Sequence, residues 1–113
     1  MEHIRHSVDV LAKLCRDGRA VVHPDVFGEA LIGCGVERDE IVAEMRLIPM
    51  LDRLQQRQLE ELVENNGIAC KRIGWVDAGI LCSAIVNGAG TTVLTFDKRL
   101  LREALRLGVA FSG

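Results

Sequence analysis

Three acidic residues stand at positions where a carboxylate could take part in catalysis or ligand binding. Asp97 directly follows the apolar stretch 91–96, and ligands of open parallel sheets bind beyond the carboxyl ends of the strands. Asp77 lies four residues before Leu81, on the apolar stripe of a helix, where a bare charge is costly to bury. Glu29 lies too far inside another helix to cap it. Each of the three is therefore a candidate for chemistry.

Each acid also has a simpler interpretation. Asp97 can cap the helix that follows it, Asp77 can favour the dipole of a helix start, and Glu29 can lie on a solvated face. Taken together, three acids from three elements are expected to converge at one end of a sheet. Clustered carboxylates repel one another unless cations neutralise them, and oxygen ligands suit Mg²⁺ or Mn²⁺. Such ions promote phosphoryl chemistry, so a phosphodiester is a reasonable substrate.

Basic residues follow the last of these acids. Arg99, Arg102 and Arg106 are spaced so that they share one stripe of a helix. The stripe is either a solvated face or a surface that contacts phosphates. Residues 71–113 carry a net charge of +3, against −5 for residues 1–70, and this asymmetry favours an anionic partner for the C-terminal part.

Helical patterns alternate with short apolar stretches along the chain. Helices are expected over 7–17, from 23–25 to Gly33, and over 37–48, 52–65, 75–87 and 98–107. The stretches 20–22, 91–96 and 109–111 predict strands. This alternation predicts an α/β layer fold with a parallel sheet, and residues 1–113 are interpreted as one domain.

The composition favours a water-soluble protein. Of the 113 residues 49% are apolar and 27% are charged, and the formal charge is −2. No apolar run approaches the roughly 20 residues that a membrane span needs, and no leader sequence is evident, so we expect a cytoplasmic protein. The four cysteines form no CxxC pair, which argues against a zinc knuckle, and we expect buried, reduced thiols: Cys15, Cys34, Cys70 and Cys82.

Two motifs resemble the C-terminal half of PIN-domain proteins, most closely the VapC-type toxins of bacterial toxin–antitoxin pairs. They are GWVDA at 74–78 and VLTFDKRL at 93–100, and the likeness extends to HPDVFGEA at 23–30 and LGVAF at 107–111. The resemblance implies a PIN-like three-layer α/β/α sandwich and an endoribonuclease that depends on Mg²⁺ or Mn²⁺ and is restrained by a cognate antitoxin.

The resemblance also implies roles for individual residues. Glu29, Asp77 and Asp97 match acidic positions of the family and would be catalytic and metal-binding, and Thr95 matches the small polar residue beside the last acid. With RNA as the substrate, the residues expected to bind it are Thr95, Lys98, Arg99, Arg102 and Arg106.

The start of the chain departs from the family pattern. The family opens with an aliphatic strand that ends in an acid, whereas this chain opens with MEHIRH, and Asp9 lies in a helical context. We therefore expect an N-terminally truncated sandwich with one carboxylate fewer and with open sheet edges, which favours a homodimer or other association.

Two functions of different classes follow. One is a metal-dependent endoribonuclease, and the other is a catalytically impaired remnant that only binds protein, either an antitoxin or itself. A weaker third hypothesis is a receiver-type domain with Asp97 as phosphoacceptor. Such a domain needs an acidic pair after its first strand, and this chain does not show that pair.

Overall fold

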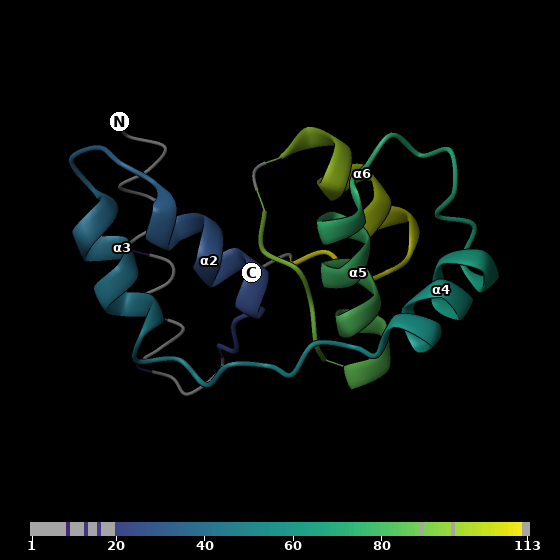
Figure 1. The fold of residues 1–113 in the computed structure, drawn as a ribbon, viewed down its shortest axis with the longest axis horizontal. Coiled ribbons are helices and arrows are strands. Elements are labelled where there is room, and N and C mark those ends of the chain that lie inside the picture. Colours follow the sequence, from purple (N-terminus) through teal and green to yellow (C-terminus); the bar gives the residue numbers. More distant parts are fainter. Residues whose placement is uncertain are drawn as a thin grey trace. The chain divides into compact units, whose positions relative to one another are not determined.

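The computed structural model describes residues 20–88, 90–95 and 97–111, together with Asp9, Lys13 and Arg16. The helices of this part are α2 (Pro24–Ile32), α3 (Arg38–Met45), α4 (Gln56–Asn65), α5 (Trp75–Asn87) and α6 (Lys98–Arg106), shown in Figure 1. They confirm the helices expected from the sequence between residues 23 and 107, with shorter bounds for α3 and α4. Of the expected helix 7–17, Asp9, Lys13 and Arg16 are helical, while its apolar positions lie outside the described residues.

The chain forms two compact units, Met1–Asp52 and Arg53–Gly113. That residues 1–113 make one domain stays a prediction. Helices α2 and α3 belong to the first unit, and α4, α5 and α6 belong to the second. Each unit is described by itself below. No helix in the described part of the chain is long and apolar enough to cross a membrane.

The predicted α/β sandwich with a parallel sheet is wrong. The described residues contain no strand, and the extended stretches pair only through two isolated parallel bridges, Val22 with Met50 and Val93 with Ala110. In the second bridge the backbone N–H of Val93 donates to the carbonyl oxygen of Val109 (2.6 Å), and the N–H of Phe111 donates to that of Val93 (2.9 Å). The two bridges lie in different units. The three layers of a PIN-like sandwich are therefore not formed by the described residues.

The strand prediction failed because apolar, β-branched stretches indicate burial as well as pairing. Val22, Val93 and Val109 are indeed buried, but they pack into the cores of largely helical units. β-Propensity depends on neighbouring strands that pair and cover the side chains. With one bridge in each unit, these stretches act as extended connections between helices.

In the first unit, a histidine begins α2. His23 is buried, and its Nδ1 accepts a hydrogen bond from the backbone N–H of Asp25 (3.0 Å), while Pro24 occupies the first helical position. The neighbouring α3 buries Val42, and the guanidinium of Arg46 lies 5.2 Å from the centre of the Phe27 ring. The start of α2 is thus fixed locally by the His-Pro-Asp sequence.

Helix α5 forms the centre of the second unit. It contacts both α4 and α6, as Figure 1 shows. One buried cluster joins α5 to α6 and the bridge residues, and the other joins α5 to α4. Ile73 and Leu107 pack against both clusters, so the unit has one continuous core. The members of the two clusters are, first, Leu81, Ala84, Val93, Leu100, Ala104 and Val109, and second, Leu59, Ile68, Ala78 and Cys82.

The expectation of buried thiols is correct for one described cysteine and wrong for two. Cys82 lies in the core of the second unit, and burial raises the pKa of its thiol. Cys34 and Cys70 are free and exposed, and Cys15 lies outside the described residues. Cys34 lies between two glycines after α2 and Cys70 lies in a turn, so neither belongs to an apolar helical face.

Candidate functional site

Asp97 occupies the N-cap of α6. Its backbone is extended, and its Oδ1 accepts a hydrogen bond from the backbone N–H of Leu100 (2.9 Å). The backbone N–H of Asp97 in turn donates to the hydroxyl of Thr95 (3.1 Å). The simpler interpretation of Asp97 as a helix cap is therefore confirmed. Its carboxylate is nevertheless exposed, so one oxygen remains open to another partner.

Asp77 lies in the first turn of α5. The N-cap of this helix is Gly74, and the carboxylate of Asp77 accepts a hydrogen bond from the Gly74 backbone N–H. This is the reach-back half of a capping box, made by an acid at the third helical position. Asp77 is half-buried, in agreement with its place at the edge of an apolar stripe.

The two acids influence each other electrostatically. The pKa of Asp77 is raised above its usual value of 3.8, first by burial and second by the negative charge of Asp97, while the hydrogen bond from Gly74 lowers it. Since α5 packs against α6, the starts of both helices present a carboxylate within electrostatic range of the other. Two neighbouring carboxylates repel each other, so the pair favours the protonation of one carboxylate or the binding of a cation.

Glu29, the third predicted ligand, lies exposed on α2 in the first unit. The structure thus brings Asp77 and Asp97 together in the second unit, whereas Glu29 belongs to the first. Among the described residues, no group of three or more His, Cys, Asp or Glu side chains is arranged to hold a metal ion. The candidate site therefore consists of the two aspartates, which we call the acid pair.

The predicted RNA-binding residues divide into two kinds. Lys98, Arg99 and Arg102 are exposed on α6 and form no ion pair with a described residue. Thr95 is half-buried, and its hydroxyl is engaged with the backbone of Asp97. Contact between these residues and RNA stays a prediction.

Arg106 differs from the other arginines of its stripe. Its Nε donates to the carboxylate of Glu103 (2.8 Å), and its Nη2 donates to the carbonyl oxygens of Asn66 (3.0 Å) and Gly67 (3.3 Å) at the end of α4. Glu103 is itself buried, with 3% of its surface exposed. Arg106 therefore joins α6 to the end of α4, in addition to any role toward a ligand. We call this set of contacts the Arg106 clip.

Sequence reasoning missed two features of this unit. The sequence contains no indication that Glu103 is buried, because a glutamate in a helix is normally solvated. Its partner Arg106 also contacts carbonyl oxygens that lie 40 and 39 positions earlier in the chain, which no local pattern indicates. The turn before α5 was also missed. There Cys70 (φ 65°) and Arg72 (φ 62°) adopt the left-handed conformation that side-chain-bearing residues seldom take.

Comparisons of the chain with family models, with curated proteins and with solved structures found no match. The likeness to PIN-domain proteins rests on the motifs of the sequence and stays a prediction.

Proposed function

We propose that the chain is a metal-dependent endoribonuclease whose acid pair holds a divalent cation, Mg²⁺ or Mn²⁺. The observation that supports this most directly is the electrostatic coupling of Asp77 and Asp97 at the starts of two packed helices. The resemblance of GWVDA and TFDKRL to VapC-type toxins adds the substrate class, RNA, and a cytoplasmic role under a cognate antitoxin.

The residues of the acid pair suit a hard divalent cation. Carboxylate oxygens are the ligands that Mg²⁺ and Mn²⁺ prefer, and Mg²⁺ is commonly held by one or two carboxylates with water completing its shell. The raised pKa of Asp77 records an unfavourable ionised state that a cation relieves. The two aspartates therefore fit such an ion, and the proposal does not depend on Glu29.

Each residue of the site has a defined task in this proposal. A bound divalent cation supplies an activated water and stabilises the charge of the phosphoryl oxygens. Asp77 and Asp97 hold the positive charge against the phosphodiester, and the hydrogen bonds from Gly74 and Leu100 fix the two carboxylates in orientation. Exposed Lys98, Arg99 and Arg102 attract the RNA backbone beside them. Since a proton competes for Asp77, metal binding should weaken as the pH falls.

Calorimetric titration with Mn²⁺ tests the proposal. Asp97→Asn keeps a capping oxygen while it removes the charge, because Asn and Asp cap helices about equally well. We expect Asp97→Asn and Asp77→Asn each to weaken binding by about tenfold, roughly 1.4 kcal/mol. Asp52→Asn is the matched control, since Asp52 is an exposed acid that is not a member of the pair, and it should bind as the parent does.

Cleavage of a single-stranded RNA in the presence of Mn²⁺ completes the test. Asp77→Asn should abolish cleavage and Asp52→Asn should preserve it. Equal Mn²⁺ affinity in the parent, Asp77→Asn and Asp97→Asn would refute the metal site. Normal Mn²⁺ binding without any cleavage of RNA would favour the second candidate function.

The second candidate is a non-catalytic protein that binds an antitoxin or another copy of itself. It is favoured by three large apolar side chains of the first unit that are exposed by 79%, 84% and 75%, namely Ile32, Val36 and Leu47. Contact with a partner would remove these apolar side chains from water. Light scattering of the purified chain separates a monomer from a self-associated form.

A further inference from the structure

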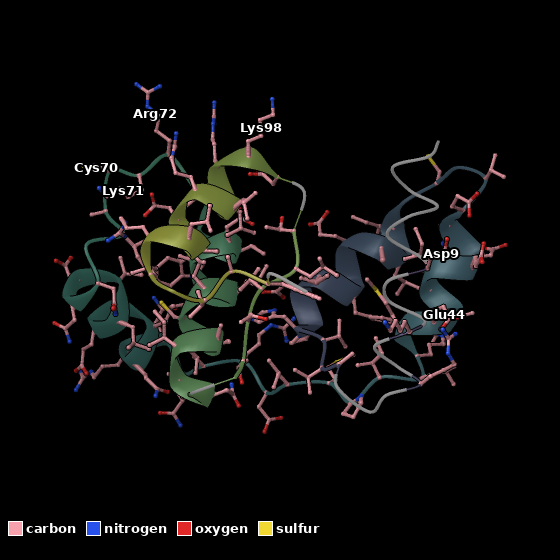
Figure 2. All side chains as sticks on the ribbon, turned by 180° about the vertical axis from the view of Figure 1, so that it is seen from behind. Asp9, Glu44, Cys70, Lys71, Arg72 and Lys98 are labelled. Carbon is pink, nitrogen blue, oxygen red and sulfur yellow. The ribbon has the colours of Figure 1, made fainter. Side chains whose placement is uncertain are left out.

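The turn that leads into α5 carries two cations, Lys71 and Arg72. Lys71 is half-buried and Arg72 is exposed, and Arg72 holds its position in a left-handed backbone conformation (φ 62°). Figure 2 shows the side chains of Arg72 and Lys98 projecting beyond the same edge of the second unit. The two cations therefore come from separate elements, the turn before α5 and the start of α6.

The chain itself fixes the turn close to the acids. The N–H of Gly74 donates to the carboxylate of Asp77, and Arg72 is only two residues earlier. Successive Cα atoms of trans peptides are about 3.8 Å apart, so the Cα of Arg72 lies within about 7.6 Å of that of Gly74. On the other side, Lys98 directly follows Asp97. Cations thus flank the acid pair on both elements that carry it.

These cations are not used within the described structure. Lys71, Arg72, Lys98 and Arg99 form no ion pair with a described residue, whereas Arg106 is held in its clip. Residues 71–113 carry a net charge of +3, which attracts a polyanion. An acidic peptide offers carboxylates alone, whereas a single-stranded nucleic acid offers both phosphates and bases.

An aromatic side chain lies next to the turn. Trp75 is the single tryptophan of the chain, it is the first residue of α5, and half of its surface (50%) is exposed. Exposed aromatic rings stack on the bases of single-stranded nucleic acids, and they do so with little regard to sequence. Two cations followed by an exposed indole are complementary to a single-stranded nucleic acid, in which phosphates alternate with bases.

We propose that Lys71, Arg72 and Trp75 form a binding face for single-stranded RNA. The two cations contact phosphates of the strand together with Lys98, which projects beyond the same edge as Arg72, and Trp75 stacks on a base. This inference rests on the proposed function for the identity of the polyanion, and it adds residues that position the strand over the acid pair.

Binding of a fluorescein-labelled ten-nucleotide oligouridine to the intact chain tests the proposal, measured by polarisation in EDTA between 50 and 200 mM KCl. Arg72→Gly removes the cation and suits the left-handed backbone, so folding is not at risk. Lys71→Ala is the second variant. Arg57→Ala is the matched control, because Arg57 is exposed on α4 and also lacks an ion pair with a described residue. Each lost phosphate contact should lower the salt slope by about 0.7.

Across that salt range, a change of about 0.7 in slope means that the parent loses roughly 2.6-fold more affinity than Arg72→Gly or Lys71→Ala. Arg57→Ala should keep the slope of the parent. RNA should also quench the fluorescence of Trp75, while a polyglutamate chain of similar length should not. Parental slopes in both Arg72→Gly and Lys71→Ala would overturn the proposal, as would equal quenching by polyglutamate.

The two proposals fail separately. Because the RNA titration contains EDTA, it does not depend on a metal. If Asp97→Asn weakens Mn²⁺ binding while Arg72→Gly and Lys71→Ala both keep the salt slope of the parent for RNA, only this binding face is refuted. If Arg72→Gly lowers the salt slope of RNA binding while the acid pair binds no Mn²⁺, only the metal-dependent function is refuted.

Discussion

The ionised carboxylate of Asp77 destabilises the folded chain, because burial and the charge of Asp97 both raise its pKa. A group with a raised pKa binds its proton more tightly in the folded state, so stability falls as the pH rises from the unfolded pKa through the folded one. Asp77→Asn removes this effect, since Asn is uncharged and its amide oxygen still accepts from Gly74. We expect Asp77→Asn to increase the free energy of unfolding at pH 7 by less than about 1 kcal/mol.

The pH dependence distinguishes this charge effect from a change in packing. Urea unfolding should give the same stability for the parent and Asp77→Asn below about pH 3.8, where the carboxyl is protonated, and a growing advantage for the variant above it. Millimolar Mn²⁺ should reduce the advantage, because the parent binds the ion more tightly than Asp77→Asn does. An advantage of Asp77→Asn that is equal at pH 3 and pH 7 would show that charge is not the cause.

At the same scale, the sequence predicted the acid pair but not its surroundings. Asp77 and Asp97 could be found because each stands at the start of a helix that the pattern of Gly and apolar residues defines. Glu29 was grouped with them because a sheet was expected, and the described residues do not form one. Arg72 escaped notice because its left-handed backbone depends on the whole turn, and a basic residue has no intrinsic preference for it.

At the scale of elements, the Arg106 clip connects α6 to the end of α4. Arg106→Ala leaves the buried carboxylate of Glu103 and two backbone carbonyls without their donor. An unsatisfied buried group costs about 1–3 kcal/mol, and we expect Arg106→Ala to lower the free energy of unfolding by that amount. Urea unfolding followed by circular dichroism measures it.

Arg102→Ala is the control on the same helix. Arg102 is exposed and has no ion pair with a described residue, so its removal should change stability by no more than about 0.5 kcal/mol. Equal stability of Arg106→Ala and Arg102→Ala would mean that the clip contributes nothing. Glu103→Gln removes the charge that Arg106 pairs with. Arg106→Ala should therefore lower the free energy of unfolding less in the Glu103→Gln background than in the parent.

Elements were predictable where the period of apolar residues was unambiguous. The bounds of α5 agree with the expected 75–87, because an apolar sequence lies between Gly74 and Gly88. The expected strands failed because short apolar stretches are buried equally well by helical neighbours, and only long-range pairing makes them a sheet. No local pattern contains that pairing information.

At the scale of the whole molecule, the second unit contains the acid pair, the Arg106 clip and a continuous core. Domains of about 55–65 residues are marginal but many fold alone. We therefore expect residues 53–113 to fold in isolation and to unfold cooperatively in urea, with helical circular dichroism. Mn²⁺ should stabilise this fragment, and Asp97→Asn within it should respond less.

The intact chain is the comparison for this fragment. If residues 53–113 show no cooperative transition while the intact chain does, the second unit depends on the first. If residues 53–113 fold but show no response to Mn²⁺, the acid pair alone does not hold the ion.

The Arg106 clip also has a consequence for how long the folded state persists. Its hydrogen bond to the carbonyl oxygen of Asn66 spans 40 positions of the chain, so it forms only after a long loop has closed. Contacts of such range generally follow the local helices during folding. Breaking the clip should therefore leave the folding rate nearly unchanged and quicken unfolding. The arginine that ends α6 sets the lifetime of the unit more than the speed at which it forms.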